Sequence, residues 1–204
     1  MDLTRGFTRW GSRIPGMVDP RDDPIRLVPS RYDEWCDRFE AERVRIRDAL
    51  RAQDLWDRCR RIEHVGSTAV ADLAAKDVVD LDVVVDDGAV QPVADALVDA
   101  LGGTRFENDE TWHPIHREHD GQRFNVHVFA ASSDRWKRSF VTCEVLRADP
   151  DLREEYEELK RELAAEHDDL VAYSEEKDDF VARLLRIARE DDELTVDVDV
   201  PGPD

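Results

Sequence analysis

Two aspartates alternate with apolar residues at positions 79–83, where the chain reads Val-Asp-Leu-Asp-Val. On a β-strand, residues two apart point to the same face, so Asp80 and Asp82 are expected to lie side by side. Two neighbouring carboxylates repel each other unless a cation lies between them. Mg²⁺ prefers oxygen ligands and usually joins one or two carboxylates to substrate phosphates. The spacing therefore predicts a Mg²⁺ or Mn²⁺ site on Asp80 and Asp82; the alternative is an edge strand with its polar face in water.

A tight turn at Gly66, Ser67 and Thr68 follows an expected strand at about 60–65. Glycine at a strand end lets backbone N–H groups approach a phosphate, and the serine hydroxyl adds another donor. We therefore expect this turn to bind substrate phosphates, although an ordinary turn is the alternative. On the preceding strand, the alternation allows only one of Glu63 and His64 to face the same site.

Several basic residues are candidate phosphate partners. Lys76 comes just before the aspartate strand and is one of four lysines in the chain. An ammonium group there would neutralise a phosphate as a point charge, and a surface lysine is the alternative. Arg117, Arg123 and Arg138 are further candidates for phosphate binding.

Histidines offer two further kinds of site. His127 shares a strand face with Asn125 in the segment 124–129, and imidazole is suited to ligate a metal or to act as a base. A hydrogen-bonded sheet histidine is the alternative. A second group, His113, His116 and His119, does not indicate zinc, which needs four convergent ligands, and no cysteine is spaced to complete such a set.

The turn and the acid pair together resemble a known family. Hydrophobic-Gly-Ser, a spacer, and then Asp-hydrophobic-Asp is the signature of the nucleotidyltransferase superfamily with the DNA polymerase beta-like fold. More closely, the chain resembles the GrpB family over about residues 25–189. The segments that carry this resemblance are 27–29, 61–70, 73–76, 79–81, 126–128, 136–138 and 173–177.

The resemblance implies a metal-dependent nucleotidyltransferase that acts on a nucleoside triphosphate and a hydroxyl acceptor. In that case Asp80, Asp82 and His127 would be catalytic, with Gly66, Ser67, Thr68, Lys76, Arg123 and Arg138 as the residues that bind substrate. Nucleotidyltransferases normally add a third carboxylate from a neighbouring strand, and the segment 124–128 contains none. The alternatives are a degenerate module that binds a nucleotide or phosphorylated metabolite without turnover, and a protein-interaction domain.

The elements that must position these residues can be read from periodicity. A helix is expected from Ser30, with Asp33 as a capping-box partner. A first-turn proline, Pro150, opens another helix after the cap residue Asp149. The other expected elements are strands at 78–85 and within 104–130 and helices at 90–101, from 134 and from 174. This order predicts an α/β (α+β) fold, a small mixed sheet flanked by helices, nucleotidyltransferase-like, with C-terminal helices.

The expected organisation is an N-terminal arm at 1–24, one domain at 25–190 and an acidic, disordered tail at 191–204, solvated by water. No segment has the length of apolar sequence that a membrane span or a secretory signal requires. Three cysteines lie far apart in the sequence, which favours a reducing cytoplasm.

Acidic residues dominate the charge: 49 Asp and Glu oppose 29 Lys and Arg, for a net charge of −20. An acidic, lysine-poor surface is expected for a halophilic protein, because high salt screens the repulsion among its carboxylates. No basic stripe is present to follow a phosphate backbone, so general nucleic-acid binding is not expected.

Overall fold

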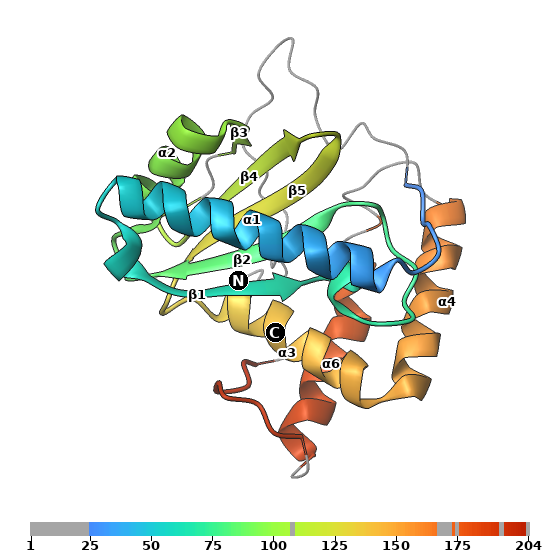
Figure 1. Ribbon diagram of the computed structural model, residues 1–204. Helices are drawn as coiled ribbons and strands as arrows, with labels where there is room; N and C mark the ends of the chain where they lie inside the picture. Colours follow the sequence, from blue (N-terminus) through green and yellow to red (C-terminus); the bar gives the residue numbers. More distant parts are fainter. Residues whose placement is uncertain (1–24, 107–108, 167–172, 174–175, 192–193, 203–204) are drawn as a thin grey trace.

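The structure is a computed structural model that describes residues 25–106, 109–166, 173, 176–191 and 194–202. The expected arm at 1–24 lies outside the described residues. Figure 1 shows the helices and strands. The strands are β1 (Cys59–Val65), β2 (Val79–Val85), β3 (Thr104–Arg105), β4 (Trp112–His119) and β5 (Gln122–Ala130). The helices are α1 (Tyr32–Ala52), α2 (Val90–Leu101), α3 (Asp134–Ala148), α4 (Pro150–Glu166) and α6 (Asp178–Glu190).

The strands form one mixed sheet in the order β1-β2-β5-β4-β3. β2 runs parallel to β5, and the other neighbouring strands are antiparallel. Asp80 lies opposite Asn125 and Asp82 opposite His127 on β5, while Glu63 lies opposite Asp82 on β1. Because directly opposed residues share a face, all five side chains belong to one face of the sheet. The predicted mixed sheet with flanking helices is confirmed.

Apolar side chains of β2 and β5 alternate with these polar ones and point to the opposite face. There α1 and α2 cover the sheet (Figure 1). Leu81, Val83 and Val126 belong to this core together with Trp35 and Ile46 of α1. Strand alternation thus separates the molecule into a packed apolar layer and a polar face.

A second core joins the Gly66–Ser67 turn region to the C-terminal helices. Val65, Ala69 and Val70 pack with buried residues of α3, α4 and α6. α3 contacts β1 directly, and α4 and α6 contact α3. The helices therefore close over the polar face of the sheet at the end where the turn lies.

Of the two predicted helix caps, one needs correction. α1 begins at Tyr32 with Arg31 as its N-cap, and the Ser30 hydroxyl makes no hydrogen bond to any described residue. Ser30 lies one residue before the cap position, so its side chain cannot take the capping role. In contrast, Asp149 Oδ1 accepts from the backbone N–H groups of Asp151 and Leu152 at 2.9 and 3.0 Å, which confirms that cap.

The last helix and the tail also differ from expectation. α6 begins at Asp178 rather than near Ser174, and positions 174–175 lie outside the described residues. The predicted solvated tail instead packs on the domain over its described part. Val198 and Val200 are partly buried against the second core, and Asp197 pairs with Arg61 at 3.2 Å. The apolar residues that alternate with the tail's acids explain this packing.

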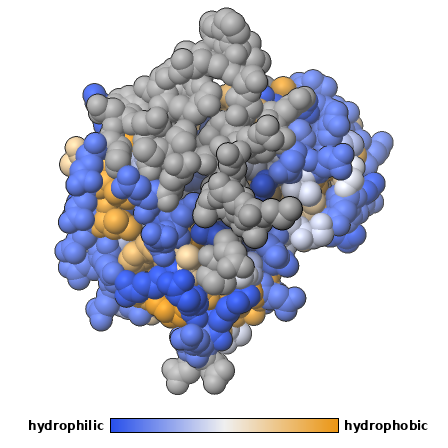
Figure 2. All heavy atoms as spheres, turned by 180° about the vertical axis from the view of Figure 1, so that it is seen from behind, coloured by the Kyte–Doolittle hydropathy of each residue, from blue (hydrophilic) through white to orange (hydrophobic). Residues whose placement is uncertain are grey.

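The face turned away in Figure 1 is mostly hydrophilic over its described residues, with small separate hydrophobic patches (Figure 2). None of the helices in the described ranges is both long enough and apolar enough to cross a membrane.

Candidate functional site

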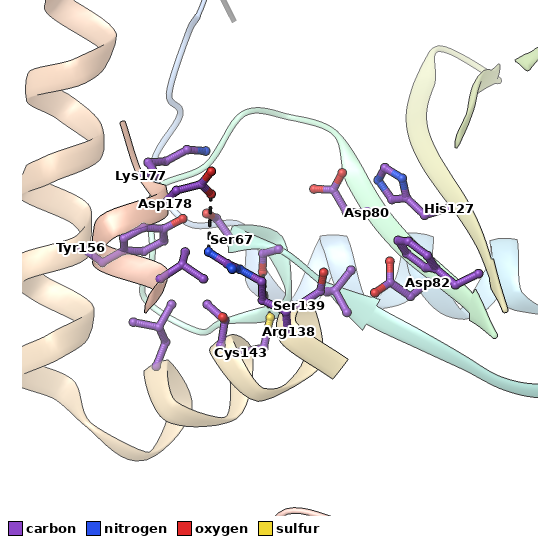
Figure 3. A pocket seen from close by; sticks show the side chains of 16 residues that line it. Ser67, Asp80, Asp82, His127, Arg138, Ser139, Cys143, Tyr156, Lys177 and Asp178 are labelled. Atoms are coloured by element: carbon purple, nitrogen blue, oxygen red, sulfur yellow. Dashed lines mark hydrogen bonds and ion pairs between the residues drawn. The ribbon is translucent and has the colours of Figure 1, made fainter. Parts of the chain in front are cut away.

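Asp80 and Asp82 lie next to each other on β2, as the sequence predicted, and His127 of β5 stands beside them (Figure 3). They line a cavity of about 190 Å³ between the sheet and the C-terminal helices. A second, larger cavity of about 790 Å³ adjoins it on the other side of Asp80. The residues shared by both cavities are Gly66, Ser67, Asp80, His127, Tyr156 and Lys177.

Asp80 is tied into a polar network. The amide Nδ2 of Asn125 donates to Asp80 Oδ1 at 2.8 Å. Burial raises the pKa of Asp80 above its ordinary value, while the Asn125 hydrogen bond and the charges of Lys76 and Lys177 act in the opposite direction. The two lysines therefore favour an ionised Asp80 at the junction of the cavities.

Asp82 is almost inaccessible, with 1% of its surface exposed. Its Oδ2 accepts no hydrogen bond from any residue that the structure describes. Burial, and then the charges of Asp80 and Glu63, raise its pKa well above the ordinary value. A hydrogen bond with the Ser139 side chain acts in the opposite direction, and a cation bound at Oδ2 would relieve the repulsion from the two other acids.

The donor set fits a hard cation only in part. Among the described residues, no group of three or more His, Cys, Asp or Glu side chains is arranged to hold a metal ion. The orphaned Oδ2 of Asp82 and the adjacent Asp80 nevertheless supply two carboxylates to one cavity. Mg²⁺ is often bound this way, with water and substrate phosphates as its remaining ligands.

Of Glu63 and His64, only Glu63 lies on the face of the sheet that carries the two aspartates. Glu63 shares the face of Asp82 and accepts from Arg61 Nε at 2.7 Å. His64 points to the opposite face, where its ring stacks on Phe39 with centroids 4.8 Å apart. Its Nε2 lies 3.0 Å from the Thr68 hydroxyl, so the predicted substrate-binding Thr68 is engaged with a histidine outside the acid face.

The Gly66–Ser67 turn lies against the acids, as predicted. Gly66 has φ +72°, and a Cβ at this position would lie 2.7 Å from Asp80 Oδ2. Glycine is therefore required both by the backbone conformation and by the close approach of the carboxylate. Beside it, Lys160 Nζ donates to Ser67 Oγ at 3.1 Å, and Tyr156 also hydrogen-bonds to Ser67.

His127 is held by a neighbour on β4. The indole Nε1–H of Trp112 donates to His127 Nδ1 at 3.2 Å. Burial lowers the pKa of His127 to about 4, so the ring is neutral at pH 7. A neutral imidazole whose Nδ1 accepts carries its proton on Nε2. The geometry thus makes Nε2 a donor, rather than the bare nitrogen that a metal ligand or a base requires.

The larger cavity is basic although the chain is acidic. Besides Arg117, five lysine or arginine residues line it, against the two acidic residues Asp80 and Glu118. These five are Arg26, Lys76, Arg123, Lys160 and Lys177. The charge balance of this lining is therefore the reverse of that of the whole chain, which has 49 acidic and 29 basic residues.

The arginine candidates separate in the structure. Arg123 lines the larger cavity and Arg138 the smaller one, where it pairs with Asp178 at 3.7 Å (Figure 3). Arg117 also lines the larger cavity, but its charged group has partners within the protein. Its guanidinium is buried and donates to Glu42 and to the Leu101 carbonyl, because the strand turns it toward α1 and α2.

Three residues of the site, Tyr156, Lys160 and Lys177, were not predicted. They come from α4 and from the residue before α6, so they lie at least 89 positions after Ser67 in sequence. The signal that would have found two of them is the rarity of lysine.

The histidines 113, 116 and 119 all lie on β4, where His116 Nδ1 is 2.5 Å from Asn125 Oδ1.

The fold has a counterpart among solved structures. The crystal structure of the conserved protein GrpB from Enterococcus faecalis matches with a TM-score of 0.60 and 23% identity, covering 81% of this chain and 98% of that chain. At this identity the likeness establishes a shared fold.

Sequence relatives are closer. A UPF0157 protein of Deinococcus radiodurans is 35% identical over 182 residues, which are 88% of this chain and 91% of the relative. A protein of Mycolicibacterium paratuberculosis named dephospho-CoA kinase is 33% identical over 196 residues, 81% of this chain but 46% of that protein. The model of the family described as GrpB protein matches residues 24–186. The chain therefore belongs to the GrpB family.

Proposed function

We propose that this protein is a metal-dependent nucleotidyltransferase that uses a nucleoside triphosphate and a hydroxyl acceptor. The observation that carries the proposal is the position of the acid pair. Both aspartates line the small cavity, and Asp80 also lines the large basic one, in a chain whose net charge is −20. A ligand that fits both cavities would place phosphates near a metal ion held by the two aspartates. It would place further negative charge in the basic cavity.

Each residue of the site would have its own role in binding or catalysis. Asp80 and Asp82 would hold Mg²⁺ or Mn²⁺, which lowers the repulsion between the carboxylates and the phosphates. The Gly66–Ser67 turn would bind phosphate oxygens through backbone N–H groups and the hydroxyl. Nε2–H of His127 would donate to an oxygen of the phosphoryl group that is transferred.

The proposed reaction is an in-line displacement at the α-phosphorus. The acceptor oxygen forms a bond to phosphorus, the bond to the bridging oxygen of the β-phosphate breaks, and pyrophosphate leaves. The proton of the acceptor hydroxyl is released to solvent. The donors fixed around the cavity would supply orientation and charge stabilisation, which dominate catalysis of this class.

A second candidate is a module that binds a nucleotide or phosphorylated metabolite without turnover. The favouring observation is on β5, where Asn125 and His127 stand opposite the two aspartates. Neither can be the third carboxylate of an active nucleotidyltransferase, and the Trp112 bond leaves His127 without a free base nitrogen. The other acids on this face of the sheet are Glu63 on β1 and Glu118 on β4, which lies opposite Arg123.

Calorimetry of the full chain with MnCl₂ and each common nucleoside triphosphate tests the proposal. The double variant Asp80→Asn/Asp82→Asn should lose metal-dependent binding. Its matched control is Asp95→Asn/Asp99→Asn on the exposed side of α2, which changes the net charge equally and should bind like the parent. If the parent and the site variant bind equally, or neither binds, the proposal is wrong.

Product analysis separates the two candidates. An enzyme releases pyrophosphate when acceptor hydroxyls are supplied, and His127→Ala should reduce that release while metal and nucleotide still bind. A binding module releases no pyrophosphate in any variant, although it binds the nucleotide.

A further inference from the structure

Lysine is concentrated in one place in this chain. Four lysines stand against 25 arginines, and three of the four, Lys76, Lys160 and Lys177, line the larger cavity. The fourth, Lys137, lies on α3 and pairs with Asp134 at 2.8 Å. Lysine differs from arginine in its compact charge and in a pKa that burial can move into the physiological range. The cavity therefore uses a cation that the rest of the chain avoids.

Two of the amines converge beside Asp80. Lys76 Nζ lies 6.0 Å and Lys177 Nζ 4.2 Å from the ring centroid of Tyr173. Both charges act on the Asp80 carboxylate and on each other. Asp178, the residue after Lys177, acts on Lys177 as well.

The third amine, that of Lys160, is hydrogen-bonded to the Gly66–Ser67 turn. Lys160 is 1% exposed and donates both to Ser67 Oγ and to the Ala74 carbonyl. Ser67 Oγ therefore accepts from the ammonium, and Tyr156 is a second hydrogen-bond partner of the same hydroxyl. Lys160 thus fixes the position of the Ser67 hydroxyl, which lines both cavities.

The environment of Lys160 and Lys177 disfavours their protonated forms when no ligand is bound. Burial is the largest cause that lowers the pKa of Lys177 to about 7; Lys76 acts in the same direction, and Asp80 and Asp178 oppose it. Burial likewise lowers the pKa of Lys160 to about 7, with Lys177 and Arg161 adding to it and Glu157 opposing. The aromatic rings of Tyr156 and Tyr173 face the same amines.

We propose that Lys76 and Lys177, with the Lys160-held hydroxyl of Ser67, bind a chain of two or three phosphates directly, without a metal ion. The proposal rests on the proposed function, because it assigns the end of the nucleotide that leaves to this part of the same site. The shared chemistry is an oligophosphate, whether free or attached to a nucleoside. A multiply charged anion would favour the protonated forms of Lys160 and Lys177.

Proton uptake is the consequence that distinguishes this site from simple charge attraction. Above pH 7 the free protein has lost protons that the complex keeps, so binding takes up protons and weakens as the pH rises. Each linked proton changes the affinity by up to about tenfold per pH unit. The charge of an oligophosphate itself increases with pH and would act in the opposite direction.

The test is calorimetry of the full chain with sodium tripolyphosphate in EDTA at pH 6.5 and 8.5, in two buffers of different ionisation enthalpy. We expect binding at pH 6.5, at least about tenfold weaker binding at pH 8.5 and net proton uptake at pH 8. A nucleoside triphosphate run in parallel shows whether the nucleoside adds affinity. Absence of binding, or affinity that increases with pH, would overturn the proposal.

Variants make the test specific. Lys177→Met and Lys76→Met should each weaken binding at pH 6.5 by at least about tenfold, while Lys137→Met should bind like the parent. Lys177→Arg should keep binding and lose part of the proton uptake, because guanidinium does not titrate. Equal weakening by Lys137→Met would indicate non-specific attraction and would contradict the site.

The outcomes separate this inference from the proposed function. If tripolyphosphate fails to bind in EDTA but pyrophosphate is released from nucleotides with metal, the lysine site is wrong and the function stands. If tripolyphosphate binds with the expected pH dependence and no metal-dependent nucleotide binding is found, the lysine site stands and the function is wrong.

Discussion

The indole nitrogen of Trp112 lies 3.2 Å from Nδ1 of His127, on the polar face of the sheet. Indole N–H can only donate, so Nδ1 of His127 accepts and the proton of the neutral ring is on Nε2. From the sequence we expected His127 to ligate a metal or to act as a base. Both roles need Nε2 without a proton, whereas this contact makes His127 a donor toward the cavity.

Substitution of Trp112 by phenylalanine tests that assignment. Trp112→Phe keeps an aromatic ring against Phe129 but removes the donor to Nδ1. In ¹⁵N NMR we expect the parent to show the Nε2–H tautomer of His127 from pH 8 down to near its pKa of about 4. The variant should show a mixture of tautomers. A parent ring protonated on Nδ1 would contradict the assigned role.

Gly66 offers a prediction with an internal control. Gly66→Ala places a methyl 2.7 Å from Asp80 Oδ2 at φ +72°, whereas Gly88→Ala has φ +79° and no atom within 4 Å. Both should lose about 1–2 kcal/mol from the left-handed backbone alone. Only Gly66→Ala should also displace Asp80 and weaken Mn²⁺ binding. Denaturant unfolding and metal titration of both variants check this, and equal effects on metal binding would refute the close-approach argument.

Asp82→Asn should separate binding from stability. The folded-state pKa of Asp82 is raised well above the ordinary value, mainly by burial. Between the two values the unfolded chain has lost a proton that the folded chain keeps, so this group's contribution to stability falls as pH rises through that window. Replacing it with a neutral amide, which can donate toward Asp80 or Glu63, should therefore stabilise the metal-free protein above that window.

The measurement is thermal melting of the parent and Asp82→Asn at pH 4 and pH 8 in EDTA. We expect a gain of about 1–3 kcal/mol at pH 8, the scale of a buried unsatisfied polar group, and little difference at pH 4. A variant that is less stable than the parent at pH 8 would show that the carboxylate is compensated in the folded state.

The ion pair of Arg117 and Glu42 should matter for stability but not for ligand binding. Glu42 is fully buried, and Arg45 Nε also donates to it at 2.8 Å. Arg117→Met leaves that carboxylate with one partner and should cost about 3 kcal/mol, while Arg117→Met/Glu42→Gln should cost less. The affinity of Arg117→Met for tripolyphosphate should stay within about twofold of the parent's, because Arg117 pairs with Glu42 on the α1 side of the sheet. A large loss of affinity would indicate that Arg117 binds phosphate.

Whether a site residue could be predicted from the sequence depends on whether its position is determined by local pattern or by distant contacts. Asp80 and Asp82 could be placed because strand alternation fixes the face of each residue from its position alone. The chemistry of His127 could not, because it depends on Trp112, fifteen residues away on another strand. Lys160 lies on α4 and Lys177 just before α6, and helical periodicity does not say which distant loop a helix meets.

The same distinction explains the ends of elements. Asp149 and Pro150 were assigned correctly because a first-turn proline after a cap residue marks the start of a helix, a signal that the wrongly assigned Ser30 lacks. The tail was assigned wrongly because its composition is acidic, while its packing depends on Val198 and Val200 meeting apolar residues contributed by other elements. Composition describes the average of a segment, and packing depends on the few residues that find partners.

The final prediction concerns salt. A net charge of −20 on one small domain places like charges close together, and their repulsion destabilises the folded state. The Debye length falls from about 30 Å at 0.01 M to about 3 Å at 1 M, so molar salt removes most of this repulsion. Salt also weakens the many surface ion pairs, but each of these contributes only about 0–1 kcal/mol.

We therefore expect the melting temperature to rise steeply as KCl increases from 0.01 M to molar concentration. The rival explanation is that the acidity serves a partner through concentrated patches, the run at 154–158 and the segment after Glu190. Neutralising Glu154, Glu155 and Glu158 to Gln, with the tail intact because Val198 and Val200 pack on the domain, then tests the patch. If diffuse repulsion is the cause, this variant melts higher than the parent at low salt and equally at high salt. A parent melting temperature that does not change with KCl would refute halophilic adaptation, because a fold stabilised by screening cannot be indifferent to the ions that screen it.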